Sequence, residues 1–154
     1  MPKNLSVVSK GTPDLLATGT LIVETRGEGF TDISRDARLF ATEVGAQDGA
    51  LLLFLRHTSA SLLIQENADP DVRTDLTTAL RRLAPENAGW VHTTEGPDDM
   101  PAHIKTMLAG TSLQIPVIGG ELALGTWQGI YLVEHRARPH RREVILQFTG
   151  SGNL

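Results

Sequence analysis

Short apolar runs bounded by glycine, proline and polar residues predict a chain rich in β-strands. Six such runs occur in the sequence: residues 20–24, 51–55, 61–64, 113–118, 126–136 and 143–149. The consecutive glycines Gly119 and Gly120 predict a tight turn after the fourth run, and Gly27 and Gly29 predict a loop after the first. Most of these strands follow one another directly, which favours antiparallel pairing.

Apolar residues at helical spacing predict two helices in the N-terminal half. The first runs from Ile33 to Val44, with Asp32 as its cap and Gly45 at its end. The second follows Asp69, a good N-cap residue, and has proline at its first position. Its apolar stripe ends just before a second proline, and the stripe consists of Val72, Leu76, Leu80 and Leu83.

A third helix is predicted over about residues 100–109, after a polar, acidic loop that begins near residue 87. Asp98 or Asp99 opens this helix and Gly110 closes it. The predicted apolar side consists of Met100, Ile104, Met107 and Leu108. A loop of this length is typical of functional segments, and it carries His92.

Helices and adjacent strands together predict an α+β fold, a single-domain sandwich of mixed or antiparallel sheet over residues 1–154. The 154 residues, 40% of them hydrophobic and 21% charged, suit one stable domain. The formal charge of −4 argues against a nucleic-acid partner, and the lack of cysteine excludes thiol chemistry. No apolar run has the length of a signal peptide or membrane span, so a cytoplasmic protein with no membrane partner is expected.

Three histidines are the main chemical candidates. His57 follows a buried strand, His92 lies in the polar loop, and His103 flanks the third helix. No short histidine motif links them, so only the fold can bring them together around a divalent ion, with Glu95, Asp98 or Asp99 as a further ligand or support. The alternative is that each imidazole makes an ordinary hydrogen bond and that the two aspartates cap the helix.

The run 126–136 contains charged residues that a core strand does not normally carry. Glu134 and Arg136 lie on the same face at period two, where they can pair with each other or contact a charged ligand. Arginines continue around Pro139 in the only cationic patch suited to phosphate, although a solvated hairpin loop is the simpler interpretation. Ser59 and Ser61 lie near His57, but the chain has no G-x-S-x-G nucleophile elbow, which argues against a serine hydrolase.

Three motifs in order resemble the YjbQ family of small bacterial and archaeal proteins. They are HTSASLLIQENADPDV from His57, EGPDDMPAHIK from Glu95 and IPVIGGELALGTWQGIYLVEHR from Ile115, and the resemblance covers about residues 19–150. The resemblance implies a compact α+β fold, assembly as a homotrimer, and a cleft of polar residues that binds a metal or an anion. It also implies a secondary thiamine phosphate synthase activity, without defining the principal reaction.

Carried over position by position, the resemblance implies a ligand set and a group of catalytic residues. The metal ligands are His57, His92 and His103, which hold a divalent ion such as zinc or magnesium. The family motifs also contain Asp69, Trp127 and His135. The implied catalytic residues are Asn67, Asp99, Gln128, Glu134 and Arg136.

The synthase reaction joins hydroxymethylpyrimidine diphosphate to a thiazole phosphate and releases pyrophosphate, so the substrates are small phosphorylated molecules. Cations must balance the charge of the departing pyrophosphate, and Arg136 is the expected side chain for this role. Trp127 and Tyr131 are candidates to stack on a heteroaromatic ring. Two alternatives are a metal-dependent hydrolase of a small phosphorylated or amide substrate, and a ligand-binding trimer without catalysis.

Overall fold

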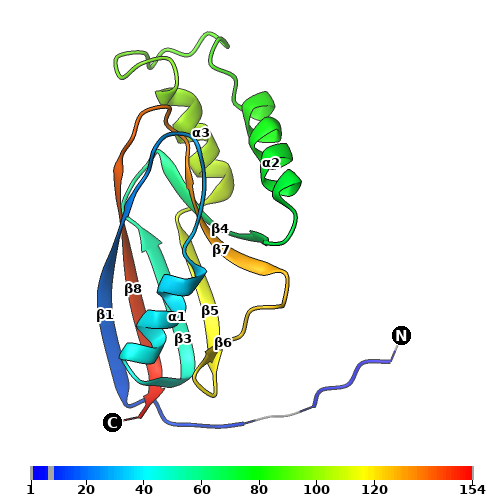
Figure 1. Ribbon diagram of the computed structural model, residues 1–154, viewed down its shortest axis with the longest axis vertical. Coiled ribbons are helices and arrows are strands. Elements are labelled where there is room, and N and C mark those ends of the chain that lie inside the picture. The colour runs from blue at the N-terminus through cyan, green and yellow to red at the C-terminus, as the bar shows by residue number, and fades with distance from the viewer. Residues whose placement is uncertain (1, 7–8, 154) are drawn as a thin grey trace.

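Two antiparallel sheets form the framework of the structure, a computed structural model that describes residues 2–6 and 9–153 (Figure 1). The three-stranded sheet has the order β2 (Gly29–Asp32), β7 (Gln128–Glu134) and β4 (Ala60–Glu66). The five-stranded sheet has the order β1 (Leu15–Glu24), β8 (Arg141–Gly152), β3 (Ala46–Leu55), β5 (Ser112–Ile118) and β6 (Glu121–Leu122).

The core lies between the inner faces of the two sheets, which curl into a half-barrel. Along β3, Leu51, Leu53 and Leu55 are buried, whereas Leu52 and Phe54 face outward and are exposed. This alternation follows from the period of two in a strand. β7 differs because it pairs with a strand on each side and is covered on both faces, so every residue from Gly129 to Glu134 is buried.

Three helices flank the sheets: α1 (Ser34–Glu43), α2 (Pro70–Leu83) and α3 (Asp99–Ala109). α1 buries Ala37 and Ala41 against the core. α2 and α3 lie beside each other at the other end of the molecule, joined by the long loop of residues 84–98 (Figure 1). The turns β1–β2, β3–β4 and β7–β8 reach the same end, so short segments from distant parts of the sequence meet there.

The predicted α+β architecture is confirmed, with all three helices close to their expected bounds. Asp69 accepts a hydrogen bond from the Asp71 backbone N–H at 2.9 Å, as an N-cap does. At α1 the N-cap position is Ile33, one residue after Asp32, whose carboxylate still accepts from Ser34 N–H. Gly119 and Gly120 form the predicted turn, with φ of 57° and 84° that a side chain would disfavour.

Several details of the prediction are wrong, among them the start of β3, which is Ala46 and not Leu51. β1 begins five residues earlier than expected, at Leu15, and the expected loop after it contains the short strand β2. β7 starts at Gln128 and ends at Glu134, because the chain turns once it reaches the end of its partners. On α3, Met107 is 76% exposed and the buried face instead includes Ala102, Lys105 and Thr106.

Candidate metal centre

Asp99 stands at the centre of a group of polar side chains at the first turn of α3. Its Oδ2 lies 2.7 Å from His92 Nε2 and 3.1 Å from His103 Nε2. One ligand atom from each of these residues lies within 4.8 Å of the other two. His103 follows Asp99 by four residues on the same helix face, and the loop 84–98 folds back to supply His92.

This group fits a divalent cation. The Thr58 carbonyl accepts a hydrogen bond from His103 Nδ1 at 2.8 Å, so a neutral His103 ring carries its lone pair on Nε2. In that form the lone pair faces the Asp99 carboxylate, so the arrangement requires positive charge between the two groups, which either a proton on Nε2 or a divalent ion supplies. Two imidazoles and a carboxylate oxygen are also a common ligand set for zinc.

Burial alone would raise the pKa of Asp99. The hydrogen bond from His92 and the charges of His103 and Arg136 outweigh burial and hold the pKa of this carboxyl below its ordinary value. Asp99 is therefore ionised at neutral pH, as a metal ligand must be.

Arg136 fixes the other oxygen of Asp99. Its Nη1 donates to Asp99 Oδ1 at 2.7 Å, its Nε donates to Asp98 Oδ2 at 3.1 Å, and its Nη2 donates to the Glu95 carbonyl at 2.8 Å. All three guanidinium nitrogens are thus engaged within the protein. These contacts favour a supporting role for Arg136 over direct contact with a pyrophosphate.

Asp98 does not cap α3 with its side chain, although it occupies the N-cap position. Its carboxylate accepts from Arg136 and from the Ala137 backbone N–H at 2.8 Å. Burial would raise the pKa of Asp98, but the hydrogen bonds from Ala137 and Arg136 lower it. Asp98 therefore ties the start of α3 to the β7–β8 turn.

Glu134 pairs with Arg142 and not with the Arg136 side chain. Arg142 is only 3% exposed, so the interpretation of this arginine as part of a solvated loop is wrong. Arg142 Nε donates to Glu134 Oε1 at 2.8 Å and Thr25 Oγ1 donates to the same oxygen at 2.6 Å. Burial would raise the pKa of Glu134, but these two hydrogen bonds hold it below its ordinary value. The period of two in β8 places Arg142 on the same face as the buried Val144, Leu146 and Phe148, and this signal in the sequence marks it as different from Arg141.

His57 lies outside the group around Asp99. Its Nε2 accepts a hydrogen bond from the Glu143 backbone N–H at 2.8 Å, so that nitrogen is already occupied. Burial and the nearby Arg142 charge lower the pKa of His57, and the neutral ring carries its proton on Nδ1. The role of His57 as a metal ligand stays a prediction, and the structure brings Asp99 to His92 and His103 in its place.

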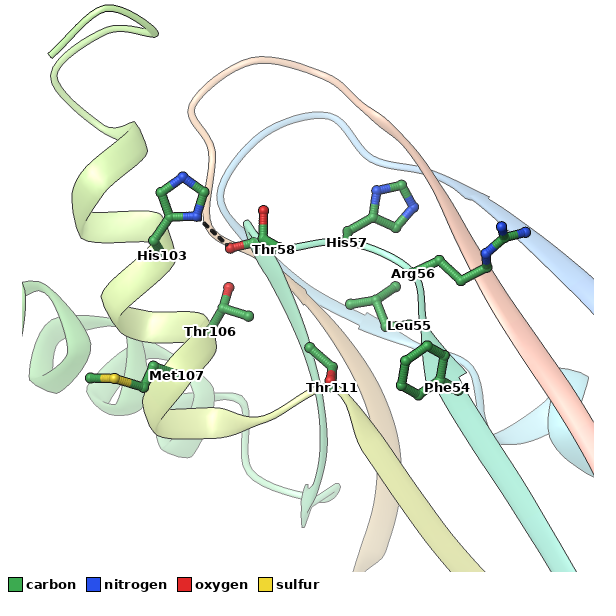
Figure 2. Close-up of a pocket in the computed structure, with 9 residues that line it drawn as sticks. All are labelled: Phe54, Leu55, Arg56, His57, Thr58, His103, Thr106, Met107 and Thr111. Atoms are coloured by element: carbon green, nitrogen blue, oxygen red, sulfur yellow. Dashed lines mark hydrogen bonds between the residues drawn. The ribbon is translucent and has the colours of Figure 1, made fainter. Parts of the chain in front are cut away.

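A pocket of about 520 Å³ connects His57 with the candidate metal centre. Figure 2 shows His57 and His103 on opposite sides of Thr58, with Arg56 at the rim. None of the residues that line the pocket carries a carboxylate, although the chain as a whole is acidic. The remaining lining residues are Phe54, Leu55, Thr106, Met107 and Thr111.

The other predicted site residues divide between two places. Four lie at the opposite end of β4 and β7, six residue steps or about 20 Å from the Ala60–Glu134 pair: Asn67, Asp69, Trp127 and Gln128. There, Asn67 Nδ2 donates to the Thr126 and Gln128 carbonyls, Gln128 Oε1 accepts from Gly125 N–H, and Trp127 is 65% exposed. These contacts shape a turn, and the four residues are not brought to the candidate metal centre.

His135 is buried next to Glu134, where its Nε2 lies 2.8 Å from Ser61 Oγ. Burial, followed by the nearby Lys105 charge, lowers the pKa of His135 to about 4. Ser61 is fully buried and is not accessible to a substrate. This geometry agrees with the argument against a serine nucleophile.

Comparison with known proteins places the chain in a family. The family model described as UPF0047 protein YjbQ-like matches residues 19–151. The UPF0047 protein sll1880 from Synechocystis is 49% identical over 131 residues, which cover 84% of this chain and 89% of that protein. The UPF0047 protein YjbQ from Salmonella typhimurium is 49% identical over 68% of this chain and 75% of its own.

Solved structures have the same fold. The crystal structure of hypothetical protein APE1520 from Aeropyrum pernix K1 superposes with a TM-score of 0.81 at 32% identity and covers 88% of this chain and 99% of that one. An uncharacterised YjbQ/UPF0047 family protein from Clostridium acetobutylicum gives a TM-score of 0.76 at 37% identity, over 86% and 98% of the two chains. Within residues 2–6 and 9–153, the helices are too short or too polar to cross a membrane. Sequence and fold agree that this chain belongs to the YjbQ-like UPF0047 family.

Proposed function

We propose that this chain is a divalent-metal-dependent enzyme that acts on small phosphorylated molecules. The first reaction to test is the joining of hydroxymethylpyrimidine diphosphate to a thiazole phosphate with release of pyrophosphate. The observation that carries the proposal is the convergence of His92, Asp99 and His103 beside a pocket without carboxylates. Zinc suits two imidazoles better than magnesium, which prefers oxygen ligands.

The chain's own residues have separate tasks in this reaction. Arg56 lines the pocket and pairs with Glu143 at 3.2 Å, and in this proposal it exchanges that partner for phosphate oxygens of the substrate. Arg136 keeps Asp99 ionised and oriented, with Oδ2 toward the two imidazoles. A divalent ion held by His92, Asp99 and His103 would add positive charge to balance the negative charge that builds on a departing pyrophosphate.

The reaction requires no general base. The lone pair of the thiazole ring nitrogen forms the new bond to the pyrimidine methylene carbon, while the carbon–oxygen bond breaks and its electrons leave with pyrophosphate. The described residues include no exposed Ser–His pair that would suggest a covalent intermediate. The proposed chemistry therefore needs positioning and charge balance only.

Hydrolysis of a single phosphorylated or amide substrate is the second candidate, because three protein ligands leave coordination positions open for water. The two pockets beside the candidate metal centre favour the reaction with two reactants. His103 lines the pocket of about 520 Å³, and His92 lines a separate pocket of about 400 Å³. A role as a non-catalytic binding protein would retain both pockets without turnover.

The test is an assay on zinc-loaded and magnesium-loaded protein with both substrates, with pyrophosphate and the joined product measured separately. Equal amounts of both products, lost in Asp99→Asn and kept in the exposed control Asp75→Asn, support the synthase. Pyrophosphate or phosphate released without the thiazole phosphate would point to the hydrolase. Loaded protein that binds these compounds without any product would contradict an enzymatic role on them.

We also propose a homotrimer. The outer face of the five-stranded sheet presents the apolar side chains Leu16, Leu52 and Phe54 to solvent, and such patches commonly mark interfaces. Light scattering after size exclusion should give about 50 kDa, three chains of 16.6 kDa. A mass near 17 kDa at micromolar concentration would contradict the trimer. A cytoplasmic location stays a prediction.

A further inference from the structure

The loop 84–98 contains a second pocket that shares one wall with the candidate metal centre. Its volume is about 400 Å³, and His92, which contacts Asp99 at 2.7 Å, is part of its lining. A ligand in this pocket would therefore lie next to the candidate metal centre, and the pocket shares no lining residue with the first pocket. The other lining residues are Glu86, Gly89, Trp90, Thr93, Gly96 and Pro97.

Trp90 provides an aromatic wall held in a fixed orientation. Its Nε1–H donates to the Pro85 carbonyl at 2.7 Å, and the ring is half-buried. Gly89, which also lines the pocket, has φ of 77°, and an ideal Cβ there would meet no atom within 4 Å, so this part of the lining is open. A fixed indole beside open space is suited to stacking with a planar ring.

Glu86 gives the lining of this pocket a negative charge. Glu86 is the only carboxylate in the lining, and residues 84–98 contain no lysine or arginine. Arg136 Nη2 comes within 4.0 Å of an ideal Cβ at Gly96, but Asp98 and Asp99 neutralise this arginine. In the first pocket, Arg56 pairs with Glu143 at 3.2 Å. The pocket in the loop 84–98 thus favours a cation over an anion.

We propose that the Trp90 pocket, meaning the pocket lined by Trp90, Glu86 and His92, binds a planar nitrogen heterocycle and prefers it positively charged. In the proposed reaction, on which this role depends, the bound heterocycle is the thiazole ring of the nucleophile, and its phosphate group lies outside this pocket because the lining has no lysine or arginine. Its ring nitrogen becomes quaternary as the new bond forms, so positive charge develops on this reactant. The indole face and Glu86 stabilise that charge more in the transition state than in the ground state, which accelerates the reaction.

The binding test needs no turnover, because 1-methylnicotinamide, a cationic heterocycle, and its neutral analogue nicotinamide serve as probes. The chain has two tryptophans, so Trp127→Phe makes Trp90 the only indole reporter. We expect saturable quenching of Trp90 fluorescence, with the cation binding roughly threefold more tightly than the neutral probe. Glu86→Gln should remove this preference, whereas Glu95→Gln, the same change outside the pocket lining, should keep it.

Amide chemical shifts of the wild-type protein provide an independent readout. Addition of 1-methylnicotinamide should move the signals of Gly89 and Gly96, and Trp90→Leu should weaken binding by about tenfold. Quenching that stays linear with concentration, shifts elsewhere in the chain, or an unchanged cation preference in Glu86→Gln would each overturn the proposal. Probe binding without synthase activity would instead leave the pocket in place and contradict only the proposed function.

Discussion

The Asp99 carboxylate makes three contacts, one with an arginine and two with histidines. Arg136 occupies Oδ1, and the two imidazoles of His92 and His103 face Oδ2. A buried carboxylate with this environment is held in one orientation, because rotation would break a charge-assisted hydrogen bond. The geometry of the candidate ligand set therefore depends on Arg136, which is not itself a ligand.

Replacement of Arg136 with Gln should weaken metal binding without abolishing it. The variant loses the hydrogen bond that orients Asp99, and it leaves Asp98 and Asp99 adjacent without their common cation. We expect a loss of zinc affinity of about tenfold, measured by calorimetric titration, because supporting residues typically contribute 10- to 100-fold. Arg138→Gln, at an exposed position two residues away, is the control. Equal affinity in Arg136→Gln and wild type would show that Asp99 needs no such support.

His135 should make stability depend on pH between about 6.5 and 4. Burial lowers its pKa from 6.5 to about 4, so the unfolded chain binds this proton first as the pH falls. The contribution of the neutral ring is complete above pH 6.5 and is lost toward pH 4, a change of about 3 kcal/mol. Urea unfolding of wild type and His135→Gln at several pH values in this range measures the change in the free energy of unfolding. The variant should have the shallower slope, with a remainder from His57, whose pKa is also lowered. If the free energy of unfolding depended on pH with the same slope in both proteins, His135 would not be the source of the pH dependence.

The individual residues of the site were only partly predictable from the sequence. His92 and His103 were candidates because imidazole is a common ligand, but their partner Asp99 was also compatible with helix capping. Arg142 and Arg136 both occur in an arginine-rich segment, and only the fold buries the first beside Glu134. Such pairings join segments distant in sequence, which a local pattern cannot specify.

At the scale of elements, α3 is attached to the rest of the fold by an ion pair as well as by apolar packing. Lys105 is 5% exposed, and its Nζ donates to Glu28 Oε2 at 3.2 Å, whereas Met107 points away from the core. Glu28 also accepts from Arg81 Nε of α2 at 2.7 Å. One carboxylate of the β1–β2 turn therefore connects both helices, and α2 itself has no fully buried residue.

Glu28→Gln should loosen α2. The change leaves Lys105 buried without its charge partner and weakens the contact with Arg81, at a cost of about 2 kcal/mol in the free energy of unfolding. Hydrogen exchange followed by mass spectrometry should show that Glu28→Gln accelerates exchange in α2 relative to wild type, and that it does so more in α2 than in β3. Asp75→Asn, an exposed change on α2, should leave the rate unchanged. If α2 exchanged at the same rate in Glu28→Gln and in wild type, Glu28 would not connect the two helices.

Helices and long strands were predictable because their apolar periods are local. β2 was not, since it has only four residues and pairs with β7 through the register Gly29–Glu134. The apolar side of α3 was also wrong, because the helix packs with Ala102 and Thr106 facing β4 and leaves its larger apolar residues exposed. Tertiary contacts decide these features, and propensity alone does not.

At the scale of the whole molecule, the half-barrel concentrates chemistry at one end. The ends of β1, β3 and β7 and the start of α3 meet there, and the long loop adds His92 (Figure 1). The opposite end of β4 and β7 carries Trp127 and Asn67 in a well-bonded turn. His103 lines one pocket and His92 lines a second one with Trp90 and Glu86, so both pockets adjoin the candidate metal centre.

The central claim is that His92, Asp99 and His103 hold one divalent ion. Its most direct test is zinc titration by calorimetry on tag-free wild type and on four variants: His92→Ala, His103→Ala, Asp99→Asn and His57→Ala. We expect one zinc per chain in wild type and in His57→Ala, and a loss of at least about tenfold in affinity in the other three. Full affinity in Asp99→Asn, or a loss in His57→Ala as large as in His103→Ala, would contradict the ligand set described for this end of the half-barrel.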